Sequence, residues 1–127
     1  MFCETNFYLC KHCKNLVGLI QSSGAVISCC GEPMVLLEAN TAEAAVEKHL
    51  PVVSVSGDAI CIQVGSAAHP MEEAHSIQWI YLQTEHGGQR KCLSPGQAPQ
   101  AEFALREDTA VAAFAYCNLH GLWKTEI

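Results

Sequence analysis

Cysteine and histidine place the strongest constraint on this chain, which has 8 Cys and 6 His among 127 residues. Thiolate and imidazole groups are the ligands that zinc, iron and other transition metals prefer. Cysteines in such numbers could instead form a disulfide scaffold, so the cellular compartment matters. Residues 1–6 have no positive segment, apolar run or small-residue cleavage site, so we expect a cytoplasmic chain whose thiols stay reduced. Metal binding is therefore favoured over disulfides.

The overall composition excludes several classes of protein. Half of the residues are hydrophobic, 16% are charged, and the formal net charge is −6. A disordered polar tail would have far less apolar content, and a nucleic-acid binder would need clustered Lys and Arg. No apolar run approaches the roughly 20 residues that span a bilayer. We therefore expect a folded domain or two, with neither nucleic acid nor membrane as a partner.

The first part of the chain, residues 1–38, holds five of the eight cysteines. A segment this short buries too little apolar surface to fold without a metal, a partner or its neighbour. Within it we expect a turn over residues 21–24 and a strand over residues 25–27 that leads to Cys29 and Cys30.

The second part, residues 39–127, has the pattern of an all-β domain. Asn40 or Thr41 could cap a short helix over residues 42–46, which must end before Pro51. Gly57-Asp58 is a hairpin signature, and residues 86–88 form a second expected turn. Short strands at such spacing indicate an antiparallel sandwich or barrel. The expected strands cover residues 52–56, 59–64, 77–83, 91–93, 100–105, 110–116 and 122–126.

Four cysteines form the first candidate metal site. Cys10 and Cys13 are separated by two residues, and fifteen further residues separate Cys13 from the adjacent pair Cys29-Cys30. Two such pairs can complete a tetrahedron around zinc or iron, and the spacing does not distinguish the two metals. Side chains of adjacent residues tend to diverge, so we expect the Cys29-Cys30 pair to strain the chain.

Four histidines and one cysteine form the second candidate site. Each histidine alone would more often be a surface residue, but all four follow or precede expected strands, and Cys117 and His120 share one short loop. Five ligands are too many for tetrahedral zinc and leave one octahedral position open, which suits a redox metal such as iron that meets a small ligand. The candidates are His49, His69, His75, Cys117 and His120.

At these residues the chain resembles the desulfoferrodoxins, the two-iron superoxide reductase family. The resemblance covers nearly the whole length and rests on Tyr8-x-Cys10-x2-Cys13, Cys29-Cys30-Gly31-x-Pro33-Met34, Glu47-Lys48-His49-x-Pro51, His69-Pro70-Met71, His75-x3-Trp79-Ile80 and Cys117-Asn118-x-His120-Gly121-x-Trp123-Lys124. It implies a desulforedoxin-like domain over residues 1–38 with a four-cysteine iron. It also implies an immunoglobulin-like, neelaredoxin-like β-sandwich over residues 39–127, with a second iron held by the four histidines and by Cys117 as the axial ligand.

The resemblance also implies a reaction: the one-electron reduction of superoxide to hydrogen peroxide, without production of O2. Lys48 would attract the anion and help to deliver a proton, and Glu47 would ligate the oxidised iron. A small electron donor such as rubredoxin and a homodimer are the implied partners. The alternatives are a non-catalytic four-cysteine metal-binding module and an electron-transfer protein. Cys3, Cys61 and Cys92 match no family motif, and we expect Cys61 and Cys92 to be small apolar strand residues.

Overall fold

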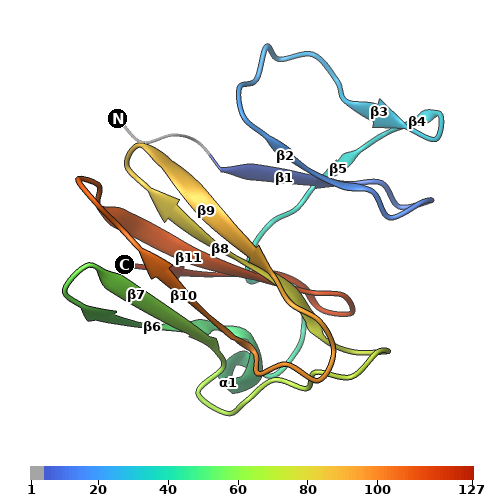
Figure 1. Cartoon of the computed structure of the whole chain (residues 1–127). Coiled ribbons are helices and arrows are strands. Elements are labelled where there is room, and N and C mark those ends of the chain that lie inside the picture. Colours follow the sequence, from blue (N-terminus) through green and yellow to red (C-terminus); the bar gives the residue numbers. More distant parts are fainter. Residues whose placement is uncertain (1–4) are drawn as a thin grey trace. The chain divides into compact units, whose positions relative to one another are not determined.

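The computed structural model describes residues 5–127 (Figure 1). These residues divide into two compact units, one ending at Glu38 and the other running from Ala39 to Ile127. Every strand pairing in both units is antiparallel. The expectation of an all-β chain is therefore confirmed. Cys3 lies outside the described residues.

The smaller unit is a minimal β-structure with very little core. Its strands are β1 (Asn6–Leu9), β2 (Leu16–Leu19), β3 (Ser28–Cys29), β4 (Glu32–Pro33) and β5 (Val35–Leu36). β2, β1 and β5 form one sheet in that order, and β3 pairs with β4. Among the described residues of this unit, Phe7 and Cys10 are the buried ones. A unit with so little buried apolar surface needs another source of stability.

The larger unit is a sandwich of two antiparallel sheets. Its strands are β6 (Pro51–Ser56), β7 (Ala59–Val64), β8 (Ile77–Thr84), β9 (Gly87–Cys92), β10 (Gln100–Ala104), β11 (Ala110–Cys117) and β12 (Gly121–Glu126). One sheet has the order β10-β7-β6 and the other β12-β11-β8-β9. This division of seven strands is typical of immunoglobulin-like sandwiches, as expected from the resemblance.

Alternating residues of both sheets form one core. On β7 the inward residues include Ile62 and Val64, and on β11 they are Ala113, Ala115 and Cys117, all completely buried. Side chains alternate between the two faces of a strand, so every second residue of β7 and of β11 points into the core. Cys117 is the last residue of the β11 row, and its thiol therefore points into the sandwich at the end of the strand.

The short helix expected over residues 42–46 lies later in the chain, although it ends before Pro51 as expected. Among the described residues there is one helix, α1 (Val46–His49), and Ala45 at its start provides no side-chain cap. Asn40 does not cap it, because its side chain bonds the backbone of Lys124 instead, donating to the carbonyl (3.0 Å) and accepting from the amide (2.8 Å). Within residues 5–127, no helix has the length and apolarity that a membrane crossing requires.

Two other local expectations are corrected. Residues 25–27 form no strand, and β3 begins only at Ser28. The carbonyl of Ile27 accepts one backbone hydrogen bond, from the amide of Met34 (2.8 Å). The turn of the second hairpin lies at residues 85 and 86, one residue earlier than the expected 86–88, because β8 ends at Thr84 and β9 begins at Gly87. Gly88 belongs to the strand, where a Cβ atom would lie 2.0 Å from the Tyr81 hydroxyl. That glycine permits a close approach rather than a turn.

The side chain of Asp108, just before β11, makes hydrogen bonds to the turn between β8 and β9 and to the residue that precedes β11. Its Oδ1 atom accepts hydrogen bonds from the backbone amides of His86 (3.3 Å) and Thr109 (2.8 Å) and lies 3.1 Å from Nδ1 of His86. The neighbouring Thr84 hydroxyl and the His86 ring lower the pKa of Asp108 from 3.8 to about 2. The carboxylate form therefore stabilises the folded state.

We expect Asp108→Asn to lower the melting temperature at pH 7. A carboxyl whose folded-state pKa is depressed contributes stability above its unfolded pKa and loses it as the pH falls through the folded pKa. The difference in melting temperature between the native chain and the variant should therefore shrink between about pH 4 and pH 2. Thermal unfolding over this pH range measures it, and a difference that stays constant down to pH 2 would contradict the assignment.

Candidate metal sites

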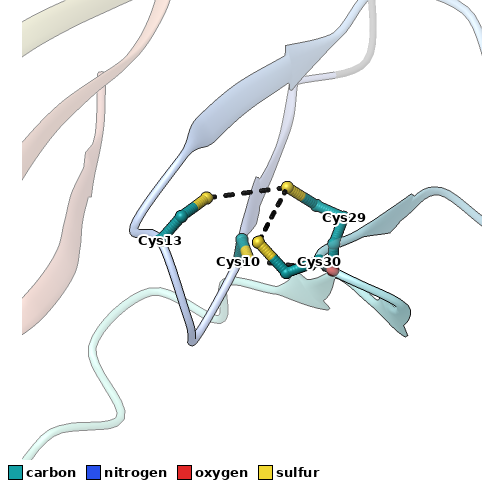
Figure 2. Close-up of side chains that lie close together, drawn as sticks. All are labelled: Cys10, Cys13, Cys29 and Cys30. Atoms are coloured by element: carbon teal, nitrogen blue, oxygen red, sulfur yellow. Dashed lines mark hydrogen bonds between the residues drawn. The ribbon is translucent and has the colours of Figure 1, made fainter.

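The four-cysteine site lies between two loops of the smaller unit (Figure 2). Cys10 and Cys13 come from the turn after β1, and Cys29 and Cys30 from the end of β3. Their sulfur atoms all lie within 4.8 Å of one another, with Cys13 to Cys29 at 3.6 Å and Cys29 to Cys30 at 4.0 Å. Four thiolates at about 2.3 Å from a tetrahedral ion are roughly 3.8 Å apart. The spacing therefore fits a single ion.

The backbone explains how two adjacent cysteines face one ion. Cys30 and Gly31 have φ angles of 53° and 78°, and they form the two-residue turn between the paired strands β3 and β4. Positive φ at both central positions is the signature of a type I′ hairpin turn. The strain expected for adjacent ligands is thus concentrated at Cys30, whose left-handed conformation turns its side chain toward the site.

The first ligand loop is closed by backbone hydrogen bonds around Cys10. The amide of Lys14 donates to the carbonyl of Cys10 (2.9 Å), and the amide of Cys10 donates to the carbonyl of Asn15 (2.8 Å). Lys14 has a φ of 68° at the position where the loop reverses. The amide side chain of Asn15 also lies 3.7 Å from the sulfur of Cys29, so it reaches the second loop. Cys10 and Cys13 are therefore held at a fixed separation.

Thiols so close together influence one another's ionisation. Backbone amides of Cys13 and His12 lower the pKa of the Cys10 thiol to about 6. The Cys13 and Cys10 thiols nearby raise the pKa of Cys30 to about 12 and also raise the pKa of Cys29. One thiolate forms readily, and further deprotonation needs positive charge within the cluster. The donor chemistry fits a bound metal.

The second site collects its ligands from three places in the sandwich. His49 is the last residue of α1, His69 and His75 lie in the long connection between β7 and β8, and Cys117 ends β11. The donor atoms of these four residues lie within 4.8 Å of one another. His120 follows in the turn to β12, with its Nδ1 atom 3.2 Å from Nε2 of His49 and 3.8 Å from the sulfur of Cys117. The structure thus brings all five candidates together.

The four imidazole rings form a closed ring. Neighbouring rings meet edge to face, with centroids 4.6 Å apart for His49 and His69, 4.7 Å for His69 and His75, 5.1 Å for His75 and His120, and 5.0 Å for His120 and His49. Across the ring, His49 and His75 are 6.5 Å apart and tilted by only 30°. The four imidazoles therefore surround one central space that an ion could occupy.

Hydrogen bonds orient two of the imidazoles toward the centre. His49 Nδ1 donates to the carbonyl of Ala45 and His69 Nδ1 donates to the carbonyl of Pro70, each at 2.7 Å. Each bond leaves an unprotonated Nε2, and these two atoms lie 3.1 Å apart. Neighbouring nitrogens at about 2.1 Å from one ion are roughly 3.0 Å apart. Burial lowers the pKa of His49 and lowers that of His69 to about 4, which keeps both rings neutral and able to bind a metal.

Two further observations test the fit of a metal. Nε2 of His75 is buried and has no hydrogen-bond partner among the described residues, although a buried imidazole nitrogen normally has one. The backbone amide of His120 donates to the sulfur of Cys117 (3.4 Å), so this sulfur is oriented as an acceptor. An inward unpartnered nitrogen beside a cysteine sulfur is the environment that a metal ligand needs. The residues present therefore fit an ion.

Glu47 and Lys48, the two expected catalytic residues, lie on α1 immediately before His49. Both side chains are exposed, and neither belongs to the ligand clusters. Cys61 lies on β7 and Cys92 on β9, and neither of these free thiols is part of a metal cluster of the described residues. His12 pairs with Glu32 (3.0 Å) and His86 with Asp108, so these two histidines are not ligands of either cluster.

Two residues near the second site had no role assigned from sequence. Trp123 stacks on the ring of His49 (4.9 Å between centroids) and donates its Nε1–H to the carbonyl of His120 (3.1 Å). Gly65 allows the His69 loop to approach α1, because a Cβ atom there would lie 2.7 Å from the carbonyl oxygen of Lys48. Trp123 appeared in a quoted motif, whereas Gly65 carried no sequence signal beyond its position at the end of a strand.

A closed site of four thiolates in a small β-unit and an open site of four imidazoles and one thiolate in a β-sandwich define a class: two-domain β-proteins with two mononuclear metal sites. The family model for desulfoferrodoxin matches residues 41–126. The desulfoferrodoxin of Nitratidesulfovibrio vulgaris is 47% identical over 97% of each chain. The chain belongs to the desulfoferrodoxin family, and its two ligand sets are those of this two-iron family.

Solved structures agree with this assignment. The superoxide reductase from Treponema pallidum matches with a TM-score of 0.82 and 38% identity, covering 97% of this chain and 99% of that one. The superoxide reductase (1Fe-SOR) from Giardia intestinalis matches with a TM-score of 0.56 and 30% identity, covering 64% of this chain and 97% of that one. These similarities support an oxidoreductase.

Proposed function

We propose that the protein is a superoxide reductase, which converts superoxide, one electron and two protons into hydrogen peroxide without forming O2. The observation that carries the proposal is the ring of four imidazoles beside the buried sulfur of Cys117. Five donors leave one position of an octahedron for a small ligand. The names of the Treponema pallidum and Giardia intestinalis structures support the same reaction.

Five residues of the sandwich would hold the iron that reacts with superoxide. Iron held by His49, His69, His75, His120 and Cys117 would supply the single electron at a position that a small anion can reach. The sulfur of Cys117, which accepts the backbone amide of His120, would donate electron density to a bound iron as a thiolate.

The net charge of −6 makes the approach of an anionic substrate unfavourable. A positively charged side chain near the site must therefore make the local electrostatic potential favourable for the anion. Lys48 is the proposed residue, because its exposed side chain directly precedes the ligand His49 on α1. Its ammonium group would attract superoxide and help to deliver a proton. Glu47, on the same helix, is proposed to hold the oxidised iron.

We expect Lys48→Ile to slow the second-order reaction with superoxide by about ten-fold or more, because electrostatic steering is lost. Pulse radiolysis or stopped-flow mixing at low ionic strength measures this rate, and the effect should weaken as salt is added.

Arg106→Ile is a matched control for the Lys48 variant. It removes one positive charge from the same unit, but Arg106 lies in the loop before β11, whereas Cys117 ends that strand. This variant should react at nearly the native rate. The proposed attraction of superoxide by Lys48 would be contradicted by an unchanged rate for iron-loaded Lys48→Ile. It would also be contradicted if both variants lost the same fraction of the rate.

The proposal extends to partners and setting. A small redox protein such as rubredoxin would supply the electron, and the chain would act as a homodimer in the cytoplasm. The boundary proposed for the two domains is between residues 38 and 39. The division of the described residues at Glu38 and Ala39 supports it.

Metal analysis with a visible spectrum tests the function against its alternatives. A superoxide reductase should contain two irons per chain and show a second band when the iron at the histidine site is oxidised. A metal-binding module would be colourless with one zinc, and an electron carrier would contain one iron with thiolate bands alone. Production of hydrogen peroxide without O2, in the presence of a chemical reductant, would complete the assignment.

A further inference from the structure

Asn118 connects two ligand loops that are far apart in the sequence. It lies between Cys117 and His120, and its side chain reaches the segment around His75. Its Nδ2 donates to the carbonyl of Ala74 (3.0 Å), and its Oδ1 accepts from the amide of Ser76 (3.0 Å). The backbone amide of Asn118 also donates to the carbonyl of Ser76 (3.3 Å). The residues on both sides of His75 are therefore bonded to the residue after Cys117.

The other histidines are held in different ways. The His69 loop is joined to α1 by backbone bonds from Gly65 to Leu50 and from Ala67 to Glu47, each at 3.0 Å. These bonds place His69 relative to His49. The contacts of Asn118 have the corresponding function for His75 and the Cys117 loop, but two of the three come from its side chain and can therefore be removed by substitution.

His75 needs such support more than its neighbours do. His49 and His69 each donate from Nδ1 to a carbonyl, which fixes the ring. No comparable bond of the His75 ring is seen among the described residues, and its buried Nε2 has no partner there. Its backbone pairs with Glu72 through two bonds (2.9 and 3.1 Å), and Ile77, two residues later, pairs with Cys117 between β8 and β11. The side-chain bonds of Asn118 hold the residues between these two points.

We infer that Asn118 is a positioning residue of the histidine and cysteine site, which sets the place of the His75 imidazole relative to the Cys117 thiolate. It acts through backbone bonds to Ala74 and Ser76. Residues that orient metal ligands commonly contribute ten- to hundred-fold to metal affinity. This inference rests on iron binding at the site and not on the proposed reaction with superoxide.

The test is Asn118→Ala in the iron-loaded full chain. We expect the iron affinity of the histidine and cysteine site to fall about ten- to hundred-fold in competition with a chelator. The thiolate-to-iron band of this site should also shift, because His75 changes its position relative to Cys117. The bands of the four-cysteine site serve as an internal control and should not change. None of these readouts requires superoxide, so failure of the proposed reaction would leave the test intact.

Asn40→Ala is the matched control. Asn40 also makes two side-chain bonds to one distant backbone segment, at Lys124, and its φ of 63° makes an alanine there unfavourable. This variant should therefore lose at least as much thermal stability as Asn118→Ala while keeping the native iron affinity and band. If Asn118→Ala does not fold, Asn118→Ser replaces it, with a smaller loss of affinity expected. Iron affinity and band equal to those of Asn40→Ala would overturn the inference.

Discussion

Removing the metal from the four-cysteine site should unfold the smaller unit and leave the sandwich folded. The described residues of the smaller unit bury only Phe7 and Cys10, whereas the sandwich has a continuous core of its own. A unit so short cannot offset its conformational entropy by burial alone. Structural metal sites of this kind contribute about 10 kcal/mol or more to folding.

The substitution Cys13→Ser tests this expectation. Cys13 is exposed, so its replacement disturbs no core packing and acts through the metal. Hydrogen exchange read by mass spectrometry should show fast exchange over residues 5–38 and native protection over β7, β8 and β11. Cys92→Ser is the control, because Cys92 is also exposed but belongs to no cluster. Native protection of residues 5–38 in the metal-free Cys13→Ser chain would contradict the expectation.

The same variant addresses the role of the first iron. If superoxide is still reduced at the native rate with a chemical reductant, the four-cysteine iron is structural. A loss of activity with the histidine site still loaded would indicate that the first iron relays electrons.

The second large effect is expected for Cys117→Ser. Cys117 is completely buried at the end of β11, and its sulfur accepts the amide of His120. A serine hydroxyl is a poorer donor of electron density to iron than a thiolate, so the thiolate-to-iron charge-transfer band of this site should disappear. Reduction of superoxide should fall by orders of magnitude, because a thiolate ligand would set the electron density at the iron.

The visible spectrum of the oxidised chain measures the loss of the band, and iron content shows whether the metal is still bound. Cys61→Ser is the control, since Cys61 lies in a strand of the same sandwich but outside the ligand cluster. It should retain the band and the activity. Survival of the band in Cys117→Ser would exclude Cys117 as the thiolate ligand.

Sequence patterns predicted the long strands well and the short elements poorly. β6, β7 and β11 each combine β-branched or alternating apolar residues with a turn, so local propensity and burial agree. The prediction of a helix over residues 42–46 was misplaced because Asn40 bonds a segment 84 residues away instead of capping it. The strand over residues 25–27 failed for a similar reason, since a strand needs a partner with matching register, and the pattern of one segment does not provide it.

The ligands of both metal sites could be found in the sequence because their chemistry is rare and their spacing is local. Cys10-x2-Cys13 and Cys117-x2-His120 each lie within one turn, so the residue types alone identify one ligand pair of each site. The contacts that bring these pairs to Cys29, His49, His69 and His75 are not local, and no distance between them can be obtained from the sequence.

The sequence by itself determined the ligand types, their number and the all-β class, because side-chain chemistry and alternation are properties of neighbouring residues. Only the tertiary structure decided that four imidazoles close into one ring, that Cys30 adopts a left-handed conformation, and that Asn118 bonds the His75 segment. These features depend on strand register and on hydrogen bonds between distant segments, such as that between Asn118 and Ala74, which are 44 residues apart. Such bonds form only when the folded core brings both segments to the same end of the sandwich.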